Sequence, residues 1–419
     1  MKETNHKIMP LVILGILFFT FGYITWTNSS LIPFLKIACQ LQSDSQAFLV
    51  ASAFYLAYFF LPIPSSWVLK KIGFLNGMIV GLLVVVLGSL VFIPAANMRD
   101  FNVFLLGLFL QGTGLALLQT AVNPYISIIG PIESAAKRIS IMGICNKIAG
   151  MLAPIVLGGI VLNKMEDFEK QLKNAIDISD KNALLDGLAQ RIITPYILLS
   201  VGLLIVAAVL WLSKLPEIKE EEDLVLNDDK TAKKNVFQFP NLVFGALAIV
   251  FYVAAEVIAG DGIGQYGKNI GISLDEAKLF PAYTLSTMLI GYVLGILFIP
   301  KYISQENALK WSAMVGIIFT MGVVFTSGYV SVLFIALMGL SNALMWPAIF
   351  PLGIKGLGKF TKIGSAIMIM GIGPGGGIIP LLYSWLAGKT SPQMGFIVMG
   401  LCYVYILFFA VYGHKKKSW

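Results

Sequence analysis

The chain has 419 residues, of which 57% are hydrophobic and 12% are charged. An ordinary soluble domain carries about 25% charged residues, so this composition excludes a soluble fold and predicts a polytopic protein of the lipid bilayer. Basic loops of a membrane protein account for the formal net charge of +8, so we expect no nucleic-acid partner.

Twelve apolar segments are long enough to cross a bilayer as helices, which takes about 20 residues each. The alternation over about ten residues that is typical of membrane β-strands does not occur in them. The sequence therefore predicts an all-α polytopic membrane fold. The predicted spans are residues 9–34, 45–69, 74–97, 101–130, 139–163, 192–213, 241–266, 279–300, 309–327, 329–353, 363–387 and 393–413.

Lysine and arginine residues are divided unevenly between the two sides of the predicted membrane. The side that holds the N-terminus collects 19 of the 30, the other side collects ten, and Lys147 falls inside a span. Positive charge is concentrated in the cytoplasmic loops of membrane proteins. The sequence therefore predicts that both termini are cytoplasmic.

The fourth and fifth spans carry polar residues too far inside for a helix that faces lipid. Gln119 and Asn123 are four residues apart and share one helix face. Asn146 and Lys147 follow the next turn by about nine residues, which at about 1.5 Å per residue is near the bilayer centre. A lysine there costs about 2.5–3.5 kcal/mol, so we expect Lys147 to have a partner.

A long polar stretch divides the spans into two sets of six. Residues 215–240 are predicted to be a cytoplasmic linker between domains 1–214 and 241–419. The fifth span contains Gly150-Met-Leu-Ala-Pro154 and the eleventh contains Gly376-Gly-Ile-Ile-Pro380, which have the same spacing at corresponding positions. This match favours an internal repeat of two pseudo-symmetric six-helix domains.

Acidic residues are rare inside the predicted spans. Of the 22 acidic residues, Glu256 lies deep in the seventh span, and Asp261 lies about one and a half turns nearer its outer end. A buried charge is either half of a structural ion pair or part of a functional site, and inside a membrane the functional interpretation is favoured. We predict that Lys147 and Glu256 face a shared cavity between the halves, directly or through water, and that both take part in substrate binding and in coupling.

Cysteine and histidine give no sign of a metal centre or a disulfide. Cys39, Cys145 and Cys402 lie in or beside apolar segments without CxxC spacing, and His6 and His414 lie at the two ends of the chain. The deep residues are amides, one acid and one lysine, and they do not form a nucleophile-and-base arrangement. We therefore expect neither catalytic residues, nor a bound metal, nor a cofactor other than a coupling ion.

Long motifs resemble the fucose and glucose–galactose permease branch of the major facilitator superfamily. They are LLQTAVNPYISIIGP at 117–131, TNSSLIPFLK at 27–36, FYVAAEV at 251–257 and GLSNALMWPAIFPLGIKGLGKFTKIGSAIMIMGIGPGGGIIP at 339–380, with YLAYFFLPIPSSWVLKKIGFLNGMIVGLL at 55–83. The resemblance implies twelve helices in two domains, a central sugar site, alternating access and a bacterial inner membrane. The residues that it implies for the sugar site are Asn28, Gln119, Asn123, Asn146, Glu256, Asn342 and Trp346.

The chain departs from proton-coupled members of that branch at three positions. Ser29 stands where those members have an aspartate, and Gln119 stands where they have a glutamate. Neither side chain titrates near neutral pH. Lys147 replaces a small polar residue. The Lys147 ammonium could stand in for a coupling cation, which favours facilitated transport. Alternatively, protonation of the Lys147 amine could drive the cycle. In the third alternative Glu256, alone or with Asp261, binds a proton or Na⁺.

The polar set suits a neutral sugar. A pyranose presents hydroxyl groups around its rim and apolar C–H patches on its faces, which amides and aromatic rings match. We therefore predict a secondary active transporter of a glucose-, galactose-, mannose- or fucose-type monosaccharide, acting as a monomeric symporter with Na⁺ or H⁺. A facilitated uniporter or a non-transporting sugar sensor remains the alternative.

Overall fold

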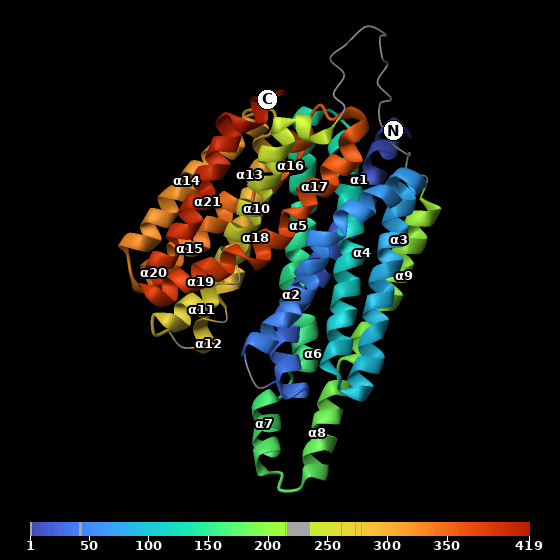
Figure 1. Cartoon of the computed structure of the whole chain (residues 1–419), viewed down its shortest axis with the longest axis vertical. Coiled ribbons are helices and arrows are strands. Elements are labelled where there is room, and N and C mark those ends of the chain that lie inside the picture. Colours follow the sequence, from blue (N-terminus) through green and yellow to red (C-terminus); the bar gives the residue numbers. More distant parts are fainter. Residues whose placement is uncertain are drawn as a thin grey trace. The chain divides into compact units, whose positions relative to one another are not determined.

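The computed structural model describes residues 2–41, 44–213, 215, 235–260, 262–272, 274–277 and 279–419. Throughout these ranges the regular elements are helices (Figure 1), which confirms the predicted all-α class. Asp261 and most of the predicted linker 215–240 lie outside the described residues.

The helices run in the following order. Before the linker the chain forms α1 (Lys2–Ala38), α2 (Asp44–Phe60), α3 (Pro62–Met98), α4 (Phe101–Ile128), η1 (Ile132–Ser134), α5 (Ala135–Ala153), the π-helical η2 (Pro154–Gly158), α6 (Gly159–Val161), α7 (Met165–Asn174), α8 (Ile178–Gln190) and α9 (Ile193–Leu212). After it come η3 (Val236–Gln238), α10 (Pro240–Gly260), α11 (Gly262–Asn269), α12 (Leu274–Ala277), α13 (Phe280–Phe298), α14 (Gln305–Phe325), α15 (Gly328–Asn342), α16 (Met345–Ile354), η4 (Gly358–Phe360), α17 (Thr361–Met370), α18 (Ile372–Gly377), α19 (Ile379–Lys389), α20 (Pro392–Gly395), α21 (Ile397–Val411) and η5 (Gly413–Lys415).

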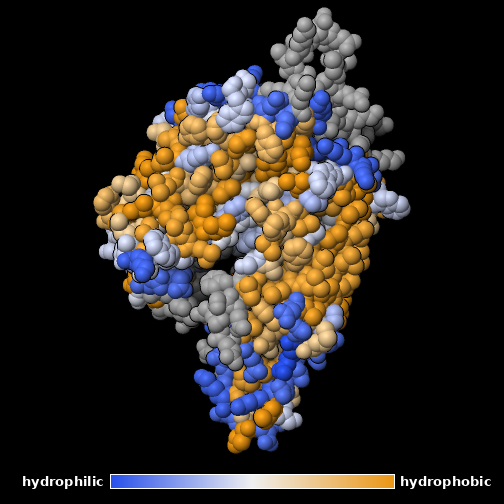
Figure 2. Space-filling view, in the orientation of Figure 1, coloured by the Kyte–Doolittle hydropathy of each residue, from blue (hydrophilic) through white to orange (hydrophobic). Residues whose placement is uncertain are grey.

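Eleven helical stretches of the described chain are long and apolar enough to cross a membrane. Figure 2 shows hydrophobic side chains over most of the visible helix surface and hydrophilic ones toward the helix ends and over α7 and α8. The difference from the twelve predicted spans lies at residues 45–69. That span is divided between the 17 residues of α2 and the start of α3, so it does not stand out as one long helix.

Gly73 marks the turn between the second and third predicted spans. Two helices meet within α3, which runs from Pro62 to Met98, and Gly73 between them has φ 80° and ψ 176°, which are not helical values. A residue with a Cβ is strained at such a positive φ, whereas glycine adopts it freely. The glycine therefore allows the chain to change direction where the two predicted spans meet.

The two Gly-x-x-x-Pro motifs both coincide with a change in helical hydrogen bonding. After Gly150, α5 ends at Ala153 and the π-helix η2 begins at Pro154. After Gly376, α18 ends at Gly377 and α19 begins one residue before Pro380. Proline has no N–H to donate and its ring crowds the preceding turn, so an α-helix is interrupted at that point.

The chain folds into two compact units. Unit 1 comprises 1–58, 75–118 and 148–215, and unit 2 comprises 59–74, 119–147 and 216–419. The boundaries of these units cut α4 between Leu118 and Gln119 and α5 between Lys147 and Ile148. The predicted domain boundaries at 214 and 240 stay a prediction.

Unit 1 has an aromatic core to which the α7–α8 hairpin contributes. Phe92 of α3 stacks on Tyr196 of α9, with ring centroids 4.1 Å apart, and Phe104 of α4 packs edge-on against Phe92. Phe168 of α7 and the buried leucines of α8 belong to the same cluster. The segment 164–191, whose apolar residues alternate with charges, is thus two helices anchored by their apolar faces.

Helix α10 is the centre of unit 2. It contacts α11, α13, α15, α16, α17, α18, α19 and α21. Small residues permit this crowding: a Cβ placed on Gly245 would lie 3.0 Å from the Cα of Gly353 on α16. At the first turn of α10, the Asn241 amide donates to the carbonyls of Leu352, Gly353 and Lys355 at 3.0–3.3 Å, which fixes the end of α16. Side chains on α10 are therefore held in a rigid frame.

Candidate polar site in unit 2

An ion pair joins α5 to α10. Lys147 Nζ donates to Glu256 Oε1, and the two side chains are only 6% and 19% exposed. The direct contact that the sequence suggested for these two residues is therefore present. Either charge alone would be costly in a low-dielectric interior, and the pair cancels both while leaving no net charge.

Two tyrosines surround the carboxylate of this pair. Tyr252 precedes Glu256 by one helical turn on α10 and is buried, and Tyr292 reaches in from α13. Both hydroxyls lie close enough to interact electrostatically with Glu256. Tyr292 fits there because α5 carries Gly143 one turn before Lys147, where a Cβ would lie 2.5 Å from the Tyr292 ring.

Helix α4 joins α16 through an amide and an indole. Trp346 Nε1 donates to Asn123 Oδ1 at 3.3 Å, and Asn123 Nδ2 donates to the carbonyl of Gln119 at 2.9 Å. The Trp346 ring lies 6.0 Å from the ring of Tyr252, centroid to centroid. The Asn123 amide of α4 thus connects through Trp346 to Tyr252 and so to the ion pair.

A helix break places Trp346 at this point. Within the predicted span 329–353, α15 ends at Asn342 and α16 begins at Met345. Pro347 cannot donate to the carbonyl one turn before it, so the helix is interrupted at Ala343 and Leu344. Trp346 then stacks on Phe350 of the same helix at 5.9 Å and remains partly accessible.

Asn342 is placed differently from the other predicted site residues. It is fully buried, its Oδ1 accepts from the Tyr403 hydroxyl at 2.9 Å, and its Nδ2 donates to the carbonyl of Ala255 at 3.4 Å. These bonds tie α15 to α21 and α10, so both ends of the amide are used inside the helix bundle. Its predicted contact with sugar stays a prediction, as does that of Asn146, which is half-buried beside Lys147 on α5.

The structure does not describe the side chains of two further predicted site residues. The backbone of Asn28 lies in α1, but its side chain is outside what the structure describes. Asp261, predicted to assist in coupling, is also outside the described residues. The cluster in unit 2 therefore comprises Gln119, Asn123, Lys147, Tyr252, Glu256, Tyr292 and Trp346, which we call the polar cluster.

Tyr292 was missed in the sequence, although its position carried a signal. It lies in the apolar segment Leu289-Ile-Gly-Tyr-Val-Leu-Gly295, where a hydroxyl needs a polar partner. Ser365 was also missed: its hydroxyl donates to the carbonyl of Thr120, one residue after Gln119, at 3.1 Å. This bond connects α17 to the turn of α4 that carries the predicted amides.

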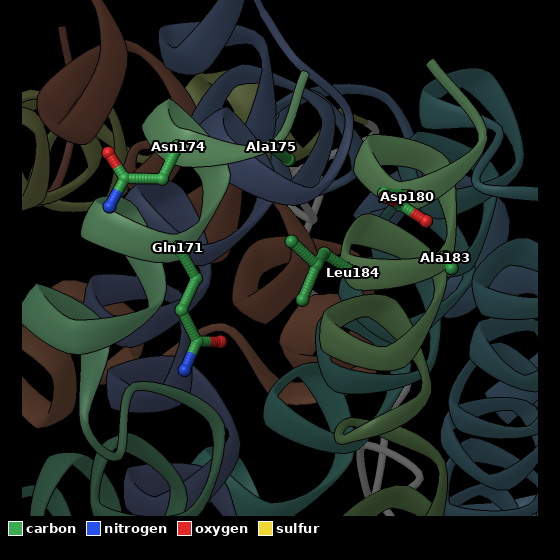
Figure 3. Close-up of a pocket in the computed structure, with 6 residues that line it drawn as sticks. All are labelled: Gln171, Asn174, Ala175, Asp180, Ala183 and Leu184. Carbon is green, nitrogen blue, oxygen red and sulfur yellow. The ribbon is translucent and has the colours of Figure 1, made fainter. Parts of the chain in front are cut away.

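A surface pocket in unit 1 is a separate feature. It is lined by Gln171, Asn174 and Ala175 from α7 and its C-terminal end, and by Asp180, Ala183 and Leu184 from α8 (Figure 3). The Leu184 side chain points into the space between the two helices, and Gln171 extends along it. The pocket offers no buried charge and no aromatic ring, and none of the predicted sugar-site residues lies in it.

The polar cluster can recognise a neutral polar molecule. It offers amide donors and acceptors, an indole ring, phenolic hydroxyls and an ion pair whose charges cancel. Among the described residues, no group of three or more His, Cys, Asp or Glu side chains could hold a metal ion. The donor set therefore fits hydroxyl groups better than it fits an anion.

Comparison with known proteins agrees with the resemblance drawn from the motifs. The family model of the Major Facilitator Superfamily matches residues 14–371. A glucose/galactose transporter of Brucella abortus biovar 1 is 33% identical over 406 residues, covering 96% of this chain and 93% of the relative. The L-fucose-proton symporter of Escherichia coli K12 is 26% identical over 412 residues, covering 97% and 94%.

A solved structure has the same architecture. The crystal structure of FucP, a major facilitator superfamily transporter in the outward conformation, matches with a TM-score of 0.83 at 27% identity, over 96% of this chain and 98% of the other. The relatives named here are transporters rather than enzymes. A family match over most of the length, together with a relative 33% identical across nearly the whole chain, shows that this protein belongs to the major facilitator superfamily.

Proposed function

We propose that this protein carries a neutral monosaccharide of the glucose, galactose, mannose or fucose type across a bacterial inner membrane by alternating access. It acts as a monomer and as a symporter driven by Na⁺ or H⁺. The names of the relatives, a glucose/galactose transporter and an L-fucose-proton symporter, support this substrate class.

The observation that carries the proposal is the composition of the polar cluster. Asn123 and Trp346 form a hydrogen-bonded pair of amide and indole, with Tyr252 beside the indole. An amide can donate and accept at neighbouring hydroxyls of a sugar, while a ring covers the apolar C–H face.

The arginines of the chain support a neutral substrate. Arginine is the side chain best matched to a carboxylate or phosphate, because its planar fork of donors binds two oxygens at once. Arg99 is paired with Asp186, Arg138 binds the end of α4, and Arg191 donates to the carbonyl of Asn163. All three arginines lie at or beside helix ends, and none belongs to the polar cluster.

Glu256 supplies the negative charge that a coupling cation needs. The resemblance implies an acid at each of two positions in proton-coupled members, and these positions are Ser29 and Gln119 here, neither of which carries charge at neutral pH. Glu256 is a half-buried carboxylate within the polar cluster, next to the residues proposed to bind sugar. A cation bound there would be close enough to affect sugar binding.

The test is counterflow of labelled glucose in proteoliposomes that contain the purified full chain. Galactose, mannose and fucose are added as competitors. We expect saturable counterflow, and we expect Trp346→Ala to raise the half-saturating sugar concentration about tenfold or more, because loss of an aromatic platform costs about 1–3 kcal/mol of binding. Trp311→Phe, at a position 56% exposed on α14, is the matched control and should behave as the parent does.

Other outcomes separate the alternatives. Saturable sugar binding without counterflow would identify a sensor and contradict transport. Uptake that responds neither to an imposed Na⁺ gradient nor to an imposed pH gradient would identify a facilitator and contradict symport. Glu256→Gln should abolish accumulation driven by either gradient, and accumulation that persists in this variant would remove Glu256 from the coupling step.

A further inference from the structure

The ion pair of the polar cluster presents a conflict with cation coupling. Lys147 Nζ already occupies an oxygen of Glu256, the carboxylate proposed to take the coupling cation. A protonated lysine and Na⁺ or H⁺ are all positive, so they compete for the same negative charge. A coupling cation can therefore bind tightly to Glu256 only when Lys147 withdraws from it.

Within the described part of the chain, Lys147 supplies the positive charge that balances the carboxylate. The charged and titratable groups that face Glu256 there include Lys147 from α5, Tyr252 from α10 itself and Tyr292 from α13. The two phenols are neutral, and their hydroxyl oxygens are of the kind that hard cations accept as ligands. Once the ammonium leaves, Glu256 and these hydroxyls form a set of oxygen ligands around a compensating cation.

Separating the two charges is costly for the ammonium as well. Lys147 is buried, and breaking a buried ion pair is strongly unfavourable unless other contacts compensate. A lysine carries three donors on a flexible chain, and sugar hydroxyls are acceptors that could replace the carboxylate. The amides and the indole proposed to hold the sugar are linked to this site through Tyr252.

From this arrangement, and resting on the proposed function, we infer that the Lys147–Glu256 pair is the coupling device. The cation binds Glu256 and the sugar binds Lys147. Binding of either ligand offsets part of the free energy needed to separate the two charges, so each ligand increases the affinity for the other. By linkage, the sugar increases cation affinity by the same factor by which the cation increases sugar affinity.

The experiment measures cation activation of counterflow at low and at saturating sugar. Proteoliposomes containing the full chain are titrated with Na⁺ against choline at fixed pH, and with pH in the absence of Na⁺. In the parent protein, the half-activating cation concentration should fall as sugar rises. In Lys147→Met the half-activating cation concentration should be about tenfold or more lower than in the parent at low sugar, because the ammonium that competes for Glu256 is gone. It should also not change with sugar concentration.

Matched variants distinguish charge from shape. Lys147→Arg keeps the positive charge and should retain the dependence of cation activation on sugar. Lys301→Met removes an exposed lysine that lies over the Tyr302 ring and should leave every titration as in the parent. If Lys147→Met and the parent show the same cation activation, or if Lys147→Arg behaves as Lys147→Met does, the inference is wrong.

A second variant tests the inference even if Lys147→Met does not fold. Glu256→Gln releases the ammonium without any cation, so its half-saturating sugar concentration should equal that of the parent at saturating cation. A value equal to that of the cation-free parent would overturn the inference.

Failure of the proposed function gives a different result. In that case the parent protein itself shows no counterflow, or its counterflow ignores both Na⁺ and pH. If the proposed function is correct and only the role of the Lys147–Glu256 pair is wrong, the parent protein is a cation-dependent transporter. Its sugar and cation affinities then do not depend on Lys147.

Discussion

At the scale of single residues, Arg138 secures the turn between α4 and α5. The last carbonyls of a helix have no partner within it, and α4 ends at Ile128. The planar guanidinium presents five N–H donors in a fixed geometry and supplies those partners. Its acceptors, at 2.7–3.2 Å, are the carbonyls of Ile126, Ser127, Gly130 and Pro131 and the hydroxyl of Ser134.

Replacing Arg138 by Ala should lower the free energy of unfolding by about 2–4 kcal/mol, since hydrogen bonds from a charged donor contribute about 1.5–3 kcal/mol each and water replaces some of them. Arg138→Lys should be intermediate, because an ammonium has three donors and no planar fork. Thermal unfolding of the purified protein in detergent measures both. Lys137→Ala, which removes a charge from the same turn, is the control, and equal midpoints for the two alanine variants would contradict the role.

Cys39, just beyond the end of α1, should be an unreactive thiol at neutral pH. Burial raises the pKa of the Cys39 thiol to about 11, and the nearby charge of Arg99 opposes this only in part. The thiolate is the nucleophile, so alkylation should accelerate about tenfold per pH unit between pH 8 and 10, whereas the rate for an ordinary thiol of pKa about 8.5 levels off within this range. A maleimide rate profile on the Cys145→Ala/Cys402→Ala variant measures this, and a plateau below pH 9 would disprove it.

At the scale of elements, the break inside α3 depends on Gly73. An alanine at φ 80° should lower the free energy of unfolding by about 1–2 kcal/mol, because its Cβ would contact the backbone. Gly202→Ala is the matched control, because that glycine is helical and a Cβ there meets no atom within 4 Å. We expect Gly73→Ala to lower the unfolding midpoint and Gly202→Ala to leave it equal or higher; the reverse order would be inconsistent with a strained turn.

The hydrogen bonds of Asn241 position α16 and, through it, Trp346. Asn241→Ala leaves the carbonyls of Leu352, Gly353 and Lys355 without this donor, which should cost about 1–3 kcal/mol of stability. Because α16 carries Trp346, the half-saturating sugar concentration should also rise. Counterflow and thermal unfolding measure the two effects, with Asn307→Ala at an exposed position of α14 as the control. A loss of stability without any change in sugar affinity would separate α16 from the binding site.

At the scale of the whole molecule, the distribution of basic residues predicts cytoplasmic termini. Nineteen of the 30 Lys and Arg residues fall on the side that holds both ends of the chain, including Lys415, Lys416 and Lys417 at the C-terminus. Green fluorescent protein fused after Trp419 should be fluorescent, and alkaline phosphatase fused there should be inactive. Active phosphatase would reverse the predicted orientation.

Much of this arrangement could be predicted from the sequence, because lipid imposes strict costs. The cost of a charge in a bilayer is large enough that Lys147 had to have a partner, and few deep acids were available, so Glu256 could be named. The interruptions at Pro154 and Pro380 were not predicted, since spans 139–163 and 363–387 were given as continuous, although the missing N–H of proline explains both.

Other features depend on packing between distant segments and carry no local signal. The side chain of Asn342 is satisfied by Tyr403, which is 61 residues away, and no pattern within either helix indicates that bond. The place of Tyr292 depends on the space above Gly143. The division of α4 and α5 between the two units also arises from tertiary packing, so hydropathy along the chain could not predict it.

The separation of Lys147 from Glu256 along the chain has a consequence for how the protein is made. Glu256 follows Lys147 by 109 residues, and a ribosome that adds about 5–20 residues per second needs roughly 5–20 s to reach it. During that interval α5 has left the exit tunnel with its ammonium and without its counter-ion. The nascent chain, rather than the finished protein, is therefore the form most open to rejection by membrane quality control.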